Sequence, residues 1–314
     1  MKIGFLFPGQ GAQAIGMGKD LYEKYEQYRN VYKKVNNITG KFIDKITFEG
    51  TEENLCKTEN TQICILTMSL AILNLLENKN IKADACMGLS LGEYTSLIYS
   101  NALSFEDGVI VVEKRGKLMQ ELCPDGDWAM IAILGLDEEK IHNICSSVKS
   151  GFIAPANYNC IGQIVLSGER LAIQEAVEKA KSEGAKKVVE LKTSGPFHTK
   201  MLSKAAEELK NELNNIKIND FKVNVIKNLD GALYKKDDNI PDLLAKHIIS
   251  PVRFDIGIQT MLNLNIDTFV EIGPGKTLSG FVKRTNKDVN ILNINNVETL
   301  ESTIDFLKNG GKNE

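Results

Sequence analysis

The sequence predicts an α/β fold in which a core with a mostly parallel sheet carries an inserted ferredoxin-like subdomain. Short apolar runs alternate with helical runs towards both ends of the chain, as they do in open α/β sheets. Between these parts, residues 125–193 have the element order β-α-β-β-α-β, which is that of a ferredoxin-like unit. The 314 residues are enough for one large core with an insert. We therefore predict a core of residues 1–124 and 194–314 and an insert of residues 125–193.

The first predicted strand covers residues 2–7 and ends in the turn Pro8-Gly9-Gln10-Gly11. A glycine-bracketed loop after a strand is where α/β folds place ligands, so Gln10 is a candidate site residue. A plain turn would show the same pattern. Helices are expected at 20–35 and at 61–76, and the second of these is long and mostly apolar.

Residues 81–100 predict a strand, a tight turn and a helix, with Gly88-Leu89-Ser90-Leu91-Gly92 at the turn. This pattern matches the G-x-S-x-G elbow of hydrolase-like α/β cores, where glycines leave room for a strained turn that exposes the serine. Glu93 also follows Ser90 by three positions, which matches a helix capping box. A hydroxyl that caps a helix is poorly placed to attack a carbonyl. We favour the nucleophile, because a cap requires neither the flanking glycines nor the preceding strand.

A third helix is expected from Ser104 to about Leu122, and Arg115 falls inside its apolar stripe. Arginine is almost never buried without an anion. Arg115 should therefore meet either a protein carboxylate or the carboxylate of a ligand. The nearby elbow favours the ligand.

The predicted insert alternates strands and helices and would form a cleft with the core, which is a natural place for a substrate. Its strands are expected at 129–134, 152–157, 163–167 and 187–191, and its helices at 137–148 and 170–182.

The chain has three histidines, of which His198 follows Gly195-Pro196-Phe197 at the expected start of a helix. The positive end of the helix dipole disfavours an imidazolium and would keep His198 neutral, as a general base must be. A histidine on an apolar face is nevertheless more often only a core residue. His247, in a helix expected at 241–249, is a rival, whereas His142 should be exposed. Three scattered histidines without suitable cysteines or carboxylates predict no metal site.

The C-terminal part predicts further alternation of strands and helices, at 221–226, 254–262, 268–272, 276–283 and 289–294. The turn Gly273-Pro274-Gly275-Lys276-Thr277 resembles part of a phosphate-binding loop, but that motif requires glycine where Val270 stands. We predict a rigid turn at the end of a strand instead. Residues after Asn309 should be frayed.

Charge and cysteine content exclude several classes of partner. The formal net charge is −3 and basic residues are interleaved with acidic ones, so neither a nucleic acid nor a membrane partner is expected. The six cysteines form no C-x-x-C pair, which is typical of reduced thiols. The apolar start is too short for a signal peptide, and polar residues interrupt the longest apolar run. We expect a cytoplasmic protein.

Five motifs occur in one order with suitable spacing: residues 7–11, 88–93, 115–120, 195–198 and 271–276. With them the chain resembles the malonyl-CoA:acyl carrier protein transacylase family over nearly its whole length. The resemblance implies a ping-pong acyl transfer, in which a serine takes malonyl from coenzyme A. The serine then passes malonyl to the phosphopantetheine thiol of acyl carrier protein, for fatty-acid synthesis.

The resemblance also implies a role for each motif. Ser90 would be the nucleophile and His198 its base and later acid. The backbone N–H groups of Gln10 and Leu91 would form the oxyanion hole. Arg115 would hold the malonyl carboxylate in a bidentate pair. Malonyl-CoA is a substrate, so no cofactor is expected.

Two positions depart from the family pattern. The family usually has histidine where Leu89 stands, which changes the polar surroundings of the serine. It usually has glutamine where His247 stands, near a main-chain carbonyl that orients the catalytic histidine, and we place His247 with the substrate-binding residues.

Three alternatives stay open on the sequence. The chain could be a trans-acting malonyl acyltransferase of a polyketide synthase. It could be a serine esterase or thioesterase, which would need an Asp or Glu to orient the histidine. It could also be a binding module that has kept the fold without the activity.

Overall fold

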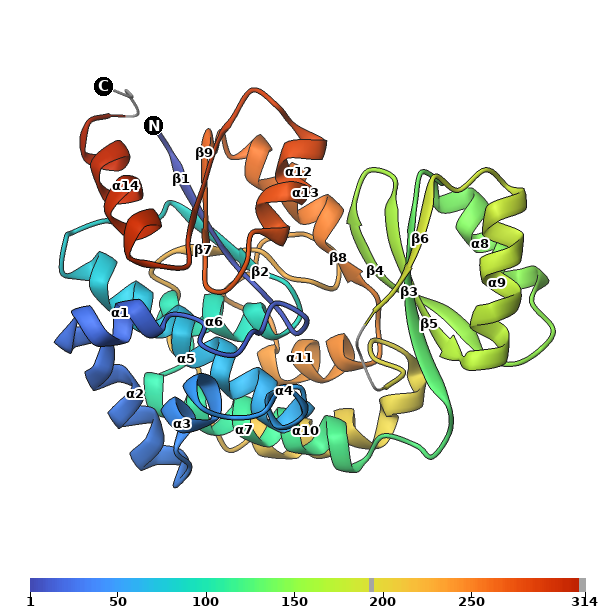
Figure 1. Ribbon diagram of the computed structural model, residues 1–314, viewed down its shortest axis with the longest axis horizontal. Coiled ribbons are helices and arrows are strands. Elements are labelled where there is room, and N and C mark those ends of the chain that lie inside the picture. Colours follow the sequence, from blue (N-terminus) through green and yellow to red (C-terminus); the bar gives the residue numbers. More distant parts are fainter. Residues whose placement is uncertain (192–194, 311–314) are drawn as a thin grey trace.

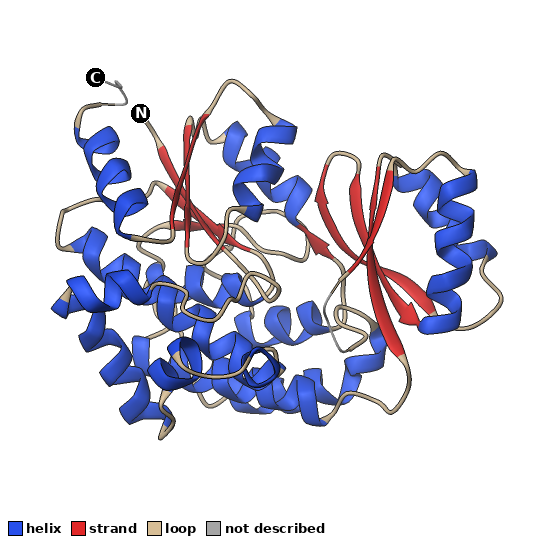
Figure 2. Ribbon diagram, viewed as in Figure 1, coloured by secondary structure: helices blue, strands red, loops and turns tan. Residues whose placement is uncertain are grey.

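The computed structural model describes residues 1–191 and 195–310, and it contains two five-stranded sheets with helices packed around them (Figures 1 and 2). The first sheet has the strand order β10-β9-β1-β2-β7, and every neighbouring pair in it is parallel. Its strands are β1 (Ile3–Phe7), β2 (Ala85–Gly88), β7 (Asn224–Val225), β9 (Thr268–Ile272) and β10 (Asn290–Ile294). This confirms the predicted parallel core sheet.

Helices cover both faces of the first sheet, which explains why its central strands are apolar without alternation. Phe5 and Phe7 pack into the larger hydrophobic cluster, whereas Leu6 between them packs into the cluster that contains Phe254 and Phe281. The helices of the core are α1 (Lys19–Lys24), α2 (Glu26–Thr39), α3 (Ile43–Phe48), α4 (Glu52–Leu55), α5 (Thr58–Glu77), α6 (Leu91–Tyr99), α7 (Phe105–Glu121), α10 (Ser203–Leu213), α11 (Ile240–Ile248), α12 (Phe254–Asn263), α13 (Thr277–Thr285) and α14 (Val297–Lys308).

Helix α5 is the central helix of the larger cluster. By length and composition alone it could cross a membrane, but 89% of its most apolar window is buried inside the protein. Its apolar residues are therefore explained by packing against α2 and α7, which it contacts more than any other helices.

The second sheet has the strand order β6-β3-β5-β4-β8. Its strands β3 (Trp128–Leu134), β4 (Ile153–Cys160), β5 (Gln163–Glu169) and β6 (Lys187–Glu190) pair antiparallel, and α8 (Glu138–Ser147) and α9 (Arg170–Ser182) lie on one face. This is the predicted ferredoxin-like order. Figure 1 shows α8 and α9 on the side of this sheet that faces away from the core.

The second sheet also takes one strand from the core, since β8 (Val252–Arg253) pairs parallel with β4. The insert is thus tied to the core by main-chain hydrogen bonds as well as by its two connections. The predicted division of the chain into domains stays a prediction, and its boundary between residues 193 and 194 lies outside the described residues.

Some expected elements differ in extent from the structure, and some helices were not expected. The helix expected at 20–35 is two helices, because Tyr25 between them has an extended backbone with φ −112° and ψ 118°. Strand β7, at one edge of its sheet, has only two of the residues expected at 221–226. Helix α14 was not expected, although Asn296 and Thr299 form a capping box at its start, a signal that the sequence carries.

Candidate active site

The turn after β2 holds Ser90 in a strained backbone conformation, with φ 53° and ψ −102°. An added Cβ at Gly88 would lie 1.9 Å from the carbonyl carbon of Gly92, and one at Gly92 would lie 2.1 Å from the Phe7 carbonyl oxygen. Larger residues at either position would force the turn apart. This confirms the expectation that the flanking positions must lack bulk.

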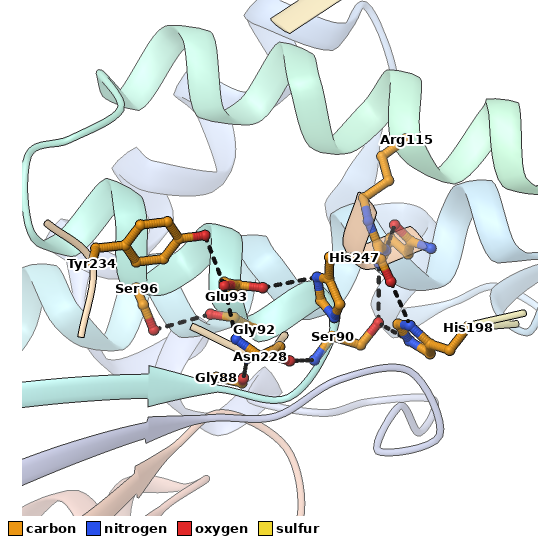
Figure 3. A network of polar contacts seen from close by, with 11 residues as sticks. Gly88, Ser90, Gly92, Glu93, Ser96, Arg115, His198, Asn228, Tyr234 and His247 are labelled. Carbon is orange, nitrogen blue, oxygen red and sulfur yellow. Dashed lines mark hydrogen bonds and ion pairs between the residues drawn. The ribbon is translucent and has the colours of Figure 1, made fainter. Parts of the chain in front are cut away.

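The Ser90 side chain does not cap the helix that it precedes, so the capping-box interpretation is wrong. Its Oγ lies 2.9 Å from His198 Nε2 and 3.0 Å from Arg115 Nη2 (Figure 3). The structure therefore brings together the hydroxyl, the imidazole and the guanidinium that the sequence singled out. Their catalytic roles stay predictions, which are developed below.

The hydrogen bonds of His198 determine which of its nitrogens is free to act as a base. The ring is 4% exposed, and its Nδ1 lies 3.0 Å from the backbone carbonyl oxygen of His247. A carbonyl oxygen can only accept, so Nδ1 carries the hydrogen in the neutral ring. Nε2 is then without a proton and accepts the hydrogen bond from the Ser90 hydroxyl. This is the arrangement that a general base requires.

Burial, followed by the nearby His247 and Arg115, holds the pKa of the His198 imidazole well below its usual value of 6.5. The ring is therefore neutral at physiological pH. The expected cause was different, namely the dipole of a following helix. In the structure a short 3-10 turn (Lys200–Leu202) separates His198 from α10, and burial is the main cause.

Arg115 lies on α7 with its side chain 1% exposed. Its Nη1 donates to Gln62 Oε1 at 2.6 Å, and its guanidinium carbon lies 5.2 Å from the centre of the Tyr94 ring. Its Nε has no hydrogen-bond partner, and no carboxylate of the described residues forms an ion pair with it. A structural ion pair is thus absent there, so the alternative left for this arginine is the carboxylate of a ligand.

The two backbone groups assigned to an oxyanion hole lie at the ends of neighbouring strands. Gln10 follows β1 and Leu91 follows Ser90 after β2, and these strands pair parallel. Neither N–H group donates to a protein acceptor in residues 1–191 and 195–310. They are thus available to a ligand oxygen, and the assignment itself stays a prediction.

His247 lies behind His198. Its ring is 1% exposed, does not line the cavity described below and stacks on the His198 ring, and its place among the substrate-binding residues stays a prediction. Helix α11 turns its buried face, which carries His247, towards α6 and His198. His142, in contrast, is exposed as expected and contacts the Tyr158 hydroxyl.

A cavity of about 480 Å³ lies between the core and the insert. From the core it is lined by Gln10, Ser90 and His198, and from the second sheet by residues that include Met130, Asn157, Asn159 and Val165. These residues belong to the sheet face opposite α8 and α9, so the open face of the insert covers Ser90. This confirms the expected cleft between core and insert.

Two further residues, which the sequence did not single out, also shape the site. Asn228 accepts from the Ser90 N–H at 2.8 Å and donates to the Gly88 carbonyl at 2.7 Å, so it clamps the elbow. It lies in an irregular segment after β7 and has no local signal. Gln62, which holds Arg115, could have been noticed as a buried polar residue in the apolar helix α5.

The part of the chain that the structure describes contains no group of three or more His, Cys, Asp or Glu side chains that could hold a metal ion.

Comparisons with known proteins point to one family. The model of the acyl transferase domain family matches residues 4–308. The malonyl CoA-acyl carrier protein transacylase of Bacillus subtilis (strain 168) is 40% identical over 314 residues, which cover 99% of each chain.

Solved structures agree with this result and confirm the α/β fold class. The crystal structure of the malonyl CoA-acyl carrier protein transacylase from Clostridium perfringens is 44% identical with a TM-score of 0.94, covering 99% of this chain and 98% of that one. A malonyl-transacylase in complex with its holo type II PKS acyl-carrier protein is 31% identical with a TM-score of 0.93, covering 97% and 99%.

Proposed function

The chain belongs to the malonyl-CoA:acyl carrier protein transacylase family of acyltransferases, and we propose that Ser90 carries the malonyl group between its two thiol carriers. The enzyme transfers malonyl from coenzyme A to the phosphopantetheine thiol of acyl carrier protein and so supplies fatty-acid synthesis. The observation that supports the proposal most directly is the 2.9 Å contact between Ser90 Oγ and His198 Nε2 at the cavity wall.

In the first half-reaction, His198 Nε2 accepts the hydroxyl proton while Ser90 Oγ bonds to the thioester carbonyl carbon of malonyl-CoA. The oxygen of the tetrahedral intermediate accepts hydrogen bonds from the N–H groups of Gln10 and Leu91. The carbon–sulfur bond then breaks, and the imidazolium returns its proton to the coenzyme A sulfur. The products are malonyl-Ser90 and free coenzyme A.

In the second half-reaction, the carrier-protein thiol enters the same cavity and gives its proton to His198. Its sulfur attacks the ester carbonyl, the bond to Ser90 Oγ breaks, and Oγ regains the proton from the imidazolium. Each substrate uses the same base in turn, as a ping-pong sequence requires.

Arg115 provides the selectivity for a carboxylated acyl group. Its Nη2 lies 3.0 Å from the atom that becomes acylated, and the malonyl carboxylate is only two bonds from the reacting carbonyl carbon. The guanidinium can therefore pair with this carboxylate in both the thioester and the seryl ester. An acetyl group offers no such anion.

The esterase alternative is disfavoured by the orientation of the base. An α/β-hydrolase triad uses Asp or Glu to orient its histidine, whereas the Nδ1 of His198 meets a main-chain carbonyl. A polyketide carrier protein is the second candidate acceptor, because a relative of this chain was solved with a type II PKS acyl-carrier protein. Assays with both kinds of carrier protein compare the two acceptors directly.

We further propose that no cofactor takes part, since side chains and backbone groups account for every proton and charge in the two steps. A cytoplasmic location is supported by the six free cysteines, which fit a reducing compartment.

Intact-mass spectrometry tests the proposed function. Incubation with malonyl-CoA should add one malonyl group to the protein, at Ser90, and the adduct should persist until a carrier thiol is added. Methylmalonyl-CoA and acetyl-CoA define the acyl choice. An adduct lost to water alone would identify an esterase, and a folded protein without any adduct would identify a binding module.

A further inference from the structure

A second imidazole lies directly behind the proposed base. The His247 ring stacks on the His198 ring with 5.0 Å between centroids and 27° between planes (Figure 3). The same residue supplies the carbonyl oxygen that accepts from His198 Nδ1 at 3.0 Å. His247 therefore contacts His198 twice, once at its edge through the main chain and once across its face through the ring.

The far side of His247 meets a carboxylate that is withdrawn from water. Its Nδ1 is in ion-pair contact with Glu93 Oε2 at 2.8 Å, and the two side chains are only 1% and 2% exposed. The other oxygen of Glu93 accepts from the Tyr234 hydroxyl at 2.8 Å and from the Asn228 N–H at 3.1 Å. Two hydrogen bonds thus hold one oxygen of the buried Glu93 carboxylate, and the other oxygen lies against His247 Nδ1 without hydrogen-bond geometry.

This network joins the serine and its base. The backbone N–H of Asn228 donates to Glu93, and the side-chain oxygen of Asn228 accepts from the Ser90 N–H. Glu93 itself lies on α6, the helix that follows Ser90. A displacement of Glu93 would thus move the elbow and the His247 ring together. The Ser90–His198 distance depends on both.

We propose that Glu93 and His247 act as a positioning pair that holds the His198 ring in place for acyl transfer. The inference rests on the proposed function, since it assigns His198 as the base. In hydrolase triads one carboxylate both fixes the tautomer and restrains the ring. Here the two tasks are divided. The main-chain carbonyl of His247 fixes the tautomer of His198, and the His247 ring, held by Glu93, restrains the tilt of the His198 ring.

The charged and titratable groups around His198 come from three elements. Arg115 faces it from α7, His247 from α11, and Glu93 lies behind His247 on α6. Tyr234 and Tyr94 complete the surroundings of Glu93. After burial, His247 is the largest cause of the lowered pKa of His198, so removal of its ring should raise that pKa.

Three substitutions of His247 separate the parts of the proposal, and all keep the main-chain carbonyl. His247→Ala removes both the stacked ring and the neighbour of Glu93. His247→Gln, the residue that the family usually carries, can still donate to Glu93 but cannot stack, whereas His247→Phe can stack but leaves Glu93 without this partner. For His247→Ala we expect the kcat of malonyl transfer to fall about ten- to a hundredfold, as for a misplaced base, with KM for malonyl-CoA nearly unchanged. His247→Gln and His247→Phe each keep one of the two contacts and should each lose less kcat than His247→Ala.

The pH profile gives an independent readout. Neutral His198 is the base, so the rate falls as the pH decreases through its pKa. With a raised pKa, the acidic limb of kcat/KM in His247→Gln should lie at higher pH than in the wild type. The exposed His142→Gln serves as the matched control and should leave both the kcat and the limb unchanged.

Imidazole NMR makes the test independent of activity, because the chain has only three histidines. In the wild type the His198 signals should report hydrogen on Nδ1, and their titration midpoint should move up in His247→Gln. If kcat, limb and midpoint all match the wild type, the pair is only core packing and the inference is wrong. A raised KM with unchanged kcat would instead make His247 a substrate contact. If malonyl-CoA never acylates the wild type, but the His198 midpoint still moves up in His247→Gln, the proposed function is wrong and the positioning pair is not.

Discussion

The turns that follow β2 and β9 share one local pattern and have different uses. Both end strands of the same parallel sheet, both contain glycines, and both lead into a helix. After β9 the positive φ angles belong to Gly273 and Gly275, at 135° and 81°. After β2 the positive φ belongs to Ser90, which has a side chain to present.

The helices that follow the two turns are capped differently as well. The carboxylate of Glu271, at the end of β9, accepts from the N–H groups of Leu278 and Ser279 at 3.1 and 2.7 Å. Ser90 makes no such bond and turns its hydroxyl to His198 and Arg115. A glycine turn thus presents a polar side chain to other groups when the strained residue carries one and distant elements supply its partners. Four predictions test this contrast.

The largest effect is expected from the reactive side chains of the β2 turn. Ser90→Ala should abolish the malonyl adduct, and His198→Ala should slow its formation about 10²- to 10⁴-fold, as the loss of a general base does. Adduct formation is measured by quenched-flow mass spectrometry. The matched change at the other turn, Glu271→Gln, should leave the adduct on Ser90. Loss of the adduct in that variant too would mean that both turns belong to the reactive site.

The next effect concerns Arg115, whose guanidinium contacts the Ser90 side chain of the β2 turn. Arg115→Ala should cost malonyl transfer about 1.5 to 3 kcal/mol, the worth of a charged hydrogen bond, and leave acetyl transfer almost unaffected. Arg115→Lys should recover little, because an ammonium lacks the planar fork of the guanidinium. Steady-state rates with the two acyl-CoA substrates measure the difference. An equal loss with both substrates would contradict the clamp.

The packing of the two turns predicts a difference in stability. Gly92→Ala places a Cβ against the Phe7 carbonyl and should lower the free energy of unfolding by about 1 to 3 kcal/mol or more. Gly275→Ala meets only Ala12 at 4.0 Å, so its cost should be that of the left-handed backbone, about 1 to 2 kcal/mol. Urea denaturation compares the variants. A larger loss for Gly275→Ala would reverse the contrast.

The smallest effect is a pH dependence of opposite sign at the two turns. The pKa of His198 is lowered, so its contribution to stability is present above 6.5 and is lost as the pH falls through the folded pKa, at most about 1.4 kcal/mol per pH unit. Burial raises the pKa of Glu271, so its contribution is present below 4.5 and is lost as the pH rises through the folded pKa.

Unfolding free energies at several pH values measure these slopes in the wild type, His198→Gln and Glu271→Gln. His198→Gln should lose less stability on acidification than the wild type does. Glu271→Gln should lose less stability as the pH rises above 4.5. Slopes equal to those of the wild type in both variants would show that neither group is shifted.

Much of the fold and of the site was predictable because the relevant signals are local. The ferredoxin-like order, the buried α5 and the elbow follow from periodicity and from glycine positions within short segments. The inward position of Arg115 followed from its place in an apolar stripe. The position of Asn228 could not be found this way, because it does not stand out from its neighbours in the sequence, and the partners of Glu93 could not be found because they come from distant segments.

The sequence alone determined which side chains carry reactive groups and which local backbone each of them sits on. Only the tertiary structure decided which of these groups meet: Ser90 and His198 are 108 positions apart, and the Ser90 N–H and Asn228 are 138 apart. It also placed the His247 ring against that of His198. The physical reason is that strand and helix signals depend on near neighbours, whereas contacts across a site depend on how whole elements pack.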